Sequence, residues 1–125
     1  MLGSAQVVAF VPATDLDRSC RFYRDVLGLA LIETNPSACV FRTGGTTLRV
    51  TKVDRLRAQP FTVLGWTVPD IQRAVDDLAD RGVAMGHYDG MGQDERGVWT
   101  APGGSLVAWF KDPDGNTLAV SQPPA

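Results

Sequence analysis

The sequence predicts an α+β fold of two tandem βαβββ modules, in which curved mixed sheets surround a cavity and the helices lie on the outer face. An apolar run that leads to an aspartate occurs twice, at Val7–Thr14 and at Phe61–Pro69. A strand pattern headed by glycine also occurs twice, at Gly45–Thr51 and Gly115–Ser121. A chain of 125 residues with 44% hydrophobic and 21% charged residues is typical of one globular domain.

The two apolar runs are expected to be strands that lead into helices. Asp15 and Asp70 follow the runs directly, and a carboxylate at a helix start accepts the free N–H groups of the first turn. Apolar residues then recur at helical spacing until Gly28 and Gly82, where a left-handed helix cap is typical. Each module therefore begins with a strand and a helix.

Three further strands in a meander complete each module. Asp112-Pro113-Asp114-Gly115-Asn116 is a strong turn signal between the last two strands of the second module. We expect strands near residues 6–12, 29–34, 38–42, 46–52, 61–68, 83–88, 105–111 and 116–121. We place module 1 at about 5–53, the linker at 54–60 and module 2 at about 61–122, all within one domain, 1–125.

Alternation along the strands indicates which way they face. Leu48 and Val50, like Leu118 and Val120, share one parity, and that side must pack under the helices. The other parity mixes apolar and polar residues. Such a mixed face favours a ligand cavity, with a solvent-facing sheet or a subunit interface as alternatives.

Charge and cysteine content exclude several classes of protein. A net charge of −2 offers no excess of cations for nucleic acid. No apolar run approaches the ~20 residues that cross a membrane, and the first residues lack a signal-peptide pattern. Cys20 and Cys39 lie inside expected elements, so we interpret them as buried small residues in a reduced, cytoplasmic protein.

Three segments together resemble the vicinal oxygen chelate superfamily, which includes glyoxalase I, bleomycin-resistance proteins and extradiol dioxygenases. They are Thr14–Arg18, Arg21–Gly28 and Trp109–Asn116. The resemblance covers nearly the whole chain, and the internal repeat supports it independently. It implies the paired-module fold, a small organic ligand and a homodimer. It does not imply one reaction, because this fold hosts lyases, dioxygenases, epimerases and binding proteins.

The metal-ligand positions of that superfamily carry no metal ligand here. The resemblance places them at Val8, Arg49, Val63 and Ala119. A hard divalent ion or zinc needs converging His, carboxylate or thiolate groups, and an arginine repels a dication. The chain's one histidine and two glutamates, His87, Glu33 and Glu95, form no ligand motif. We therefore expect neither a metal nor another cofactor.

Strand parity and loop position select the residues expected to contact the ligand. Aromatic rings with a few polar groups are typical of small-molecule pockets, although any one of these rings equally suits a core. The predicted ligand-binding residues are Phe10, Phe41, Arg49, Tyr88, Trp99 and Trp109.

The sequence leaves two interpretations of Arg49 open. Its guanidinium is a forked donor suited to a carboxylate, phosphate or carbonyl of a ligand. Alternatively it pairs with Glu33 or Glu95, or extends to solvent.

The glycine-rich segment 88–104 also has two interpretations, a lid over the cavity or an ordered surface loop.

His87 could serve as a general base, but a lone histidine without an identified carboxylate partner more often is an ordinary strand residue. No catalytic residue is assigned.

The sequence thus favours a metal-independent protein that binds a small molecule. Two rival functions remain, a lyase, isomerase or dioxygenase with an atypical site, and a ligand-responsive protein that acts through a partner protein.

Overall fold

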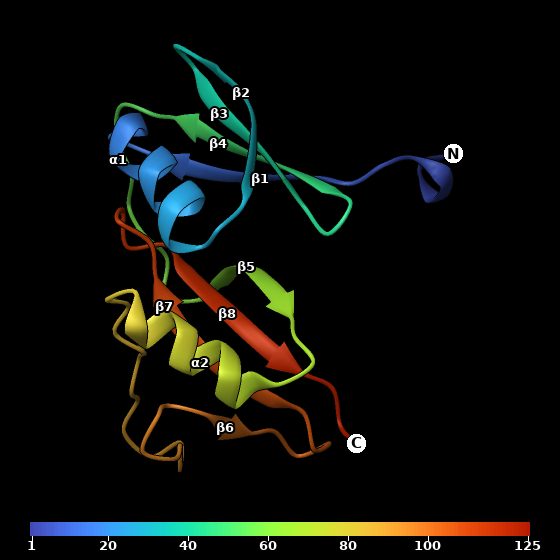
Figure 1. Ribbon diagram of the computed structural model, residues 1–125, viewed down its shortest axis with the longest axis vertical. Helices are drawn as coiled ribbons and strands as arrows, with labels where there is room; N and C mark the ends of the chain where they lie inside the picture. The colour runs from blue at the N-terminus through green and yellow to red at the C-terminus, as the bar shows by residue number, and fades with distance from the viewer. The chain divides into compact units, whose positions relative to one another are not determined.

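Each half of the chain builds its own four-stranded mixed sheet (Figure 1). The structure is a computed structural model that describes residues 1–125. The chain divides into unit 1, Met1–Arg57, and unit 2, Ala58–Ala125, and the boundary falls inside the predicted linker 54–60. The two mixed sheets with few helices confirm the predicted α+β class.

Unit 1 has the strand order β1-β4-β3-β2. Parallel pairing joins β1 to β4, and antiparallel pairing joins β4 to β3 and β3 to β2. A short 3-10 helix, Leu2–Ser4, precedes the sheet. The elements are β1 (Val8–Ala13), α1 (Leu16–Arg21), a π-helical turn (Phe22–Val26), β2 (Ala30–Asn35), β3 (Ala38–Thr43) and β4 (Thr46–Lys52).

Unit 2 repeats this topology with the strand order β5-β8-β7-β6. Parallel pairing joins β5 to β8, as it joins β1 to β4 in unit 1, so the sequence echo between the two glycine-headed segments reflects equivalent strands. The elements are β5 (Thr62–Thr67), α2 (Ile71–Asp80), β6 (Trp99–Thr100), β7 (Leu106–Lys111) and β8 (Thr117–Gln122).

The helix starts and ends follow the predicted capping chemistry. The Asp15 side chain accepts from the Arg18 N–H at 3.1 Å, and Asp70 accepts from the Arg73 N–H at 3.2 Å. Gly82 follows α2 with φ 86°, a left-handed conformation that favours glycine.

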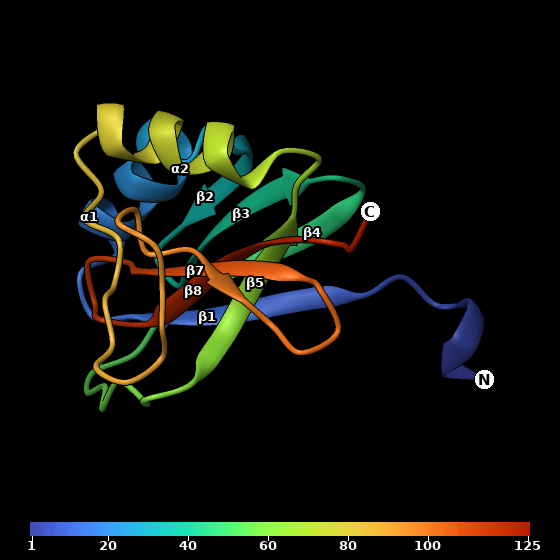
Figure 2. The ribbon, with the colours of Figure 1, turned by 90° about the horizontal axis from the view of Figure 1, so that it is seen from below.

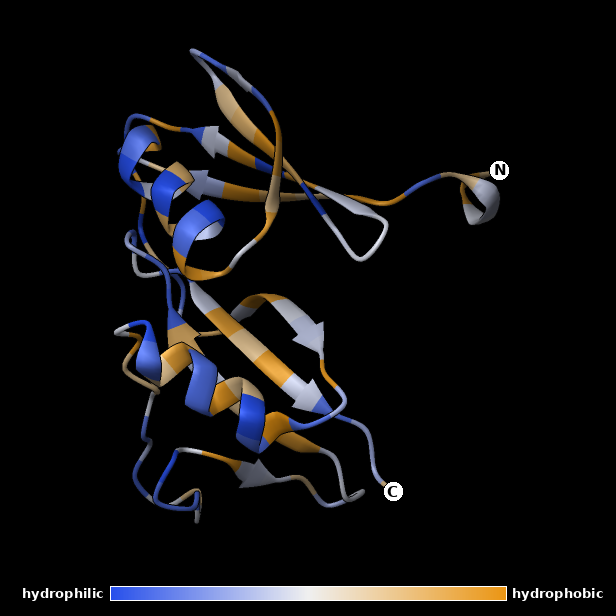
Figure 3. Ribbon diagram, in the orientation of Figure 1, coloured by the Kyte–Doolittle hydropathy of each residue, from blue (hydrophilic) through white to orange (hydrophobic).

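One helix packs on one face of each sheet, which makes that face the core. In unit 2, α2 lies along its sheet in two perpendicular views (Figures 1 and 2) and turns its apolar stripe inward (Figure 3). Ile71 from α2 and Leu118 from β8 are fully buried there. In unit 1, Leu48 and Val50 of β4 are fully buried, as parity predicts.

The strand expected at 83–88 is absent, and this prediction was wrong. Gly86 donates one backbone hydrogen bond to the Trp109 carbonyl at 2.7 Å, but no ladder forms. The Gln93 side chain donates to the Gly86 carbonyl and accepts from the Tyr88 N–H. In a strand, these backbone groups would have been available to pair with a neighbouring strand. The outer strand of this sheet is instead the two-residue β6, which pairs with β7.

The two cysteines are free and buried, as the sequence predicts. Burial raises the pKa of the Cys39 thiol to about 12, and a hydrogen bond with Cys20 adds to the shift. The thiol is therefore protonated and unreactive at neutral pH. No helix reaches the length and hydropathy that a membrane crossing demands.

Candidate functional site

A pocket of about 240 Å³ lies within unit 2, on the sheet face away from α2. Aromatic and small polar residues dominate its wall, and no acid, lysine or arginine contributes to it. Its mouth is open to solvent, because Phe61 is 58% exposed and Tyr88 41% exposed. The lining residues are Pro60, Phe61, Thr62, Tyr88, Met91, Trp109 and Thr117.

Trp109 is the centre of an aromatic cluster at this pocket. It stands on β7 opposite Ala119, on the parity away from the buried Phe110. The Tyr88 ring meets it edge-on, with centroids 5.9 Å apart and an interplanar angle of 89°. The Trp99 ring lies 5.8 Å away at 35°. Both geometries are favourable for aromatic pairs.

A hydrogen bond fixes the orientation of the Trp109 indole. Its Nε1–H donates to the Thr62 hydroxyl oxygen at 3.0 Å, which joins β7 to β5 across the intervening strand. A bulge in β5 between Thr62 and Leu64 interrupts the regular pairing with β8 at this point. The two open-face residues Thr62 and Thr117 remain paired in register and both line the pocket.

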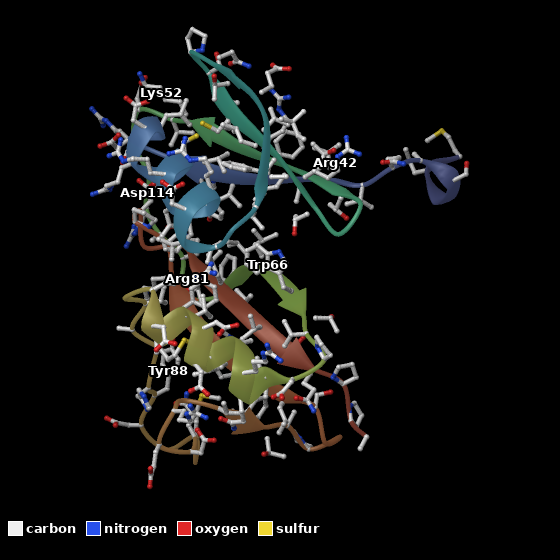
Figure 4. All side chains as sticks on the ribbon, viewed as in Figure 1. Arg42, Lys52, Trp66, Arg81, Tyr88 and Asp114 are labelled. Atoms are coloured by element: carbon white, nitrogen blue, oxygen red, sulfur yellow. The ribbon has the colours of Figure 1, made fainter.

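Gln93 holds the start of the long loop that carries Tyr88, the residue labelled in Figure 4. Its carbonyl oxygen accepts from the Tyr88 N–H at 2.6 Å. Its amide nitrogen donates to the carbonyls of Gly86 and Gly97, at 2.9 and 2.8 Å. One side chain thus ties both ends of the 86–97 loop and fixes the position from which the Tyr88 ring meets Trp109.

Asp94 holds the other side of this loop. Its carboxylate accepts from the N–H groups of Arg96 and Val98, both at 2.9 Å, and from the Gln72 side chain of α2 at 3.2 Å. Desolvation opposes ionisation, but these hydrogen bonds outweigh it and lower the pKa of Asp94. Its contribution to loop order is therefore present above the pKa of an unfolded aspartate and is lost as pH falls through the lowered pKa.

Replacing Gln93 with alanine should make the loop segment around Tyr88 more mobile without unfolding unit 2. The Tyr88 N–H loses its acceptor, which costs about 1 kcal/mol of local stability, so its hydrogen should exchange about fivefold faster. Amide hydrogen exchange measured by NMR checks this. Glu95→Ala, an exposed change in the same loop, is the matched control. Unchanged exchange at Tyr88 in Gln93→Ala would show that the loop is held by other contacts.

Unit 1 presents a second open face, formed by the parity of β1 and β4 that points away from α1. Phe10 of β1 and Arg49 of β4 are neighbours in register, and Phe10 is 63% exposed. The guanidinium of Arg49 forms no hydrogen bond or ion pair within unit 1. The pairing with Glu33 considered above is not found, and Glu33 instead accepts from Asn35 at 3.0 Å.

Phe41 lies in the core of unit 1, so its assignment to a cavity was wrong. It is fully buried, opposite the fully buried Leu48 in the β3–β4 pair. Its ring contacts that of Tyr23, from the π-helical turn, at 6.1 Å between centroids. Among the remaining predicted residues, Phe10 and Arg49 lie on the open face of unit 1 and Trp109 on that of unit 2, where it contacts Trp99 and the loop residue Tyr88.

The sequence did not identify five lining residues as ligand contacts, namely Pro60, Phe61, Thr62, Met91 and Thr117. Parity did place Thr117 on the open face. Pro60 and Phe61 carried no signal, because nothing in the local sequence indicates that they line the same pocket as the distant Trp109.

The residues at the superfamily's metal-ligand positions do not fit a metal ion. Val8, Val63 and Ala119 offer no donor atom, and Arg49 offers a positive charge. No group of three or more His, Cys, Asp or Glu side chains is arranged to hold an ion. His87 is exposed and belongs to no such group.

A comparison with protein families matches residues 5–120 to the model described as "Glyoxalase/Bleomycin resistance protein/Dioxygenase superfamily". No curated protein matches the chain.

Solved structures share the fold over nearly the whole chain. A lactoylglutathione lyase from Agrobacterium tumefaciens is 23% identical, with 98% of this chain and 96% of that one covered and a TM-score of 0.72. A glyoxalase/bleomycin resistance protein/dioxygenase from Alicyclobacillus acidocaldarius is 21% identical, with 96% and 92% covered and a TM-score of 0.73. A superfamily member from Sphaerobacter thermophilus is 20% identical, with 98% and 99% covered and a TM-score of 0.74. At these identities the likeness shows the fold alone.

Proposed function

Because the chain belongs to the Glyoxalase/Bleomycin resistance protein/Dioxygenase superfamily, we propose that it binds a small organic molecule, and that it does so without a metal ion. The observation that carries the proposal is the aromatic pocket of unit 2, with Trp109 at its centre. Binding needs affinity alone, and aromatic rings with a few fixed polar groups supply it.

The donor set supports metal independence. A metal-dependent reaction in this superfamily's manner would require ligand atoms at Val8, Arg49, Val63 and Ala119, and none of these side chains can coordinate a cation. We derive no reaction step through a metal for this reason.

Arg49 is proposed as a separate ligand contact, on the open face of unit 1 and independent of the pocket in unit 2. Phe10 beside it offers a ring, and the guanidinium lacks a protein partner in this unit. A forked donor next to an aromatic ring suits a carboxylate, phosphate or carbonyl group.

The test of the function combines metal analysis with a binding screen. We expect the purified full chain to contain less than one metal ion per chain. It should still bind its ligands when a chelator is present. A thermal-shift screen of metabolites and antibiotics, followed by calorimetry, identifies ligands through the stabilisation that binding confers. Stoichiometric Fe, Mn, Ni or Zn with catalytic turnover would contradict the proposal and favour a lyase, isomerase or dioxygenase.

Arg49→Ala should weaken binding of the carboxylate-bearing ligands from that screen by about 1.5–3 kcal/mol, the scale of hydrogen bonds to charged groups. Calorimetry of the variant and of Arg55→Ala, an exposed arginine near the boundary of the units, provides the comparison. The control should bind as the parent does. Equal affinity in Arg49→Ala would show that Arg49 contacts none of these ligands.

A further inference from the structure

We propose that the pocket of unit 2 takes an uncharged, planar aromatic molecule of one or two rings that carries a hydrogen-bond acceptor. This inference rests on the proposed function and names the class of ligand. It follows from the charge, shape and hydrogen-bonding state of the pocket wall.

The charge of the wall excludes an ionic ligand. None of the seven lining residues is an acid, a lysine or an arginine, so a charge placed there would lose water without gaining a partner. The nearest charge on the same strand is Lys111, which shares the parity of Trp109 and pairs in register with Thr117. Lys111 is exposed and does not line the pocket.

The shape of the wall favours a flat ring. Tyr88 stands at 89° to Trp109, so the two rings form a corner. A planar aromatic molecule stacked on one ring of this corner meets the edge of the other, and both arrangements are favourable. Trp99 contacts Trp109 without lining the pocket, so it supports the central ring from outside.

The volume limits the size of that ring. A closed apolar cavity of about 150 Å³ admits benzene. The pocket of about 240 Å³ therefore has room for one or two fused rings, and any further part of the ligand would extend through the open mouth.

The hydrogen-bonding state of the wall specifies the polar group. The indole Nε1–H of Trp109 is already donated to the Thr62 hydroxyl, so it is not available to a ligand. A hydroxyl accepts and donates at once, which leaves the Thr62 O–H as a donor. Thr117, its partner in register, brings a second hydroxyl to the wall. The ligand should accordingly carry a carbonyl or hydroxyl oxygen that accepts.

Three probes of similar size test the three features. They are 2-naphthol, which is neutral and flat, 2-naphthoate, which is flat and anionic, and decahydro-2-naphthol, which is neutral and not flat. Titration of the full chain is followed through the Trp109 indole N–H signal in NMR, assigned with Trp109→Phe, so that binding elsewhere on the chain is not counted.

We expect 2-naphthol to shift this signal and to bind about tenfold or more tightly than either of the other probes. Equal or tighter binding of 2-naphthoate at this signal, lost in Lys111→Met, would overturn the proposal in favour of an anionic ligand. Equal binding of the saturated probe would overturn the requirement for a flat ring.

Variants of the wall complete the test. Trp109→Leu removes the stacking ring and should abolish 2-naphthol binding in calorimetry, and Thr62→Val, a smaller change, should weaken it about fivefold through the lost donor. Ile32→Ala, an exposed apolar change in unit 1, is the control and should bind as the parent does. Unchanged affinity in Thr62→Val would overturn the assigned polar contact. The screen could yield ligands of which none shifts the Trp109 signal, with 2-naphthol also failing to shift it. In that case this inference fails while the proposed binding function stands.

Discussion

Replacing Phe41 with alanine should lower the free energy of unfolding by about 3–5 kcal/mol, the range for truncating a buried phenylalanine. The ring is fully buried between β3 and the π-helical turn, where it contacts Tyr23. Its removal leaves a cavity that Leu48, opposite it in the sheet, cannot fill without moving the strands. Chemical denaturation followed by circular dichroism measures the change.

Phe10→Ala is the matched control, since it deletes the same ring from the exposed face of the same sheet. It should change stability by about 0.5 kcal/mol or less. The pair of variants separates a core ring from a surface ring. Comparable small losses in both would contradict the placement of Phe41 in the core.

Asp112→Ala should cost about 3 kcal/mol, because it removes a buried carboxylate that holds the β7–β8 turn. Oδ1 accepts from the N–H groups of Asp114 and Asn116, at 2.9 and 3.0 Å, and Oδ2 accepts from the Asn116 side chain at 2.8 Å. Alanine leaves these donors without the carboxylate in a turn whose two ends, Asp112 and Asn116, are buried. Thermal or urea unfolding measures the loss.

Asp112→Asn provides the comparison for this turn. Its amide oxygen still accepts from the two backbone N–H groups, while its NH₂ now faces the NH₂ of Asn116. We expect a loss of stability between those of the parent and Asp112→Ala. A loss in Asp112→Ala below about 1 kcal/mol would show that water replaces the carboxylate at little cost.

The fold was predictable because its signals are local and occur twice. Asp15 and Asp70 cap helices through N–H groups three residues away, and that chemistry needs no tertiary partner. The alternation of Leu48 and Val50 in β4 likewise gave the correct buried face.

Part of the site was predictable for the same reason. Trp109 alternates with the buried Ala108 and Phe110, so its place on the open face follows from the strand alone. Its neighbours Tyr88 and Trp99 come from a long loop and a two-residue strand, and their contacts with it depend on how that loop is held.

By itself the sequence determined the repeat, the helix caps, the faces of the regular strands and the absence of ligand atoms at the metal positions. Tertiary structure decided the side taken by Phe41, because four consecutive buried residues, Ala38–Phe41, give no alternation to read. The register between β3 and β4 across the Gly44-Gly45 turn sets the face on which each β3 side chain lies. Pairing with Leu48 places Phe41 in the core. Tertiary structure also decided that residues 83–88 form no strand. The Gln93 side chain there satisfies backbone groups that strand pairing would otherwise have used.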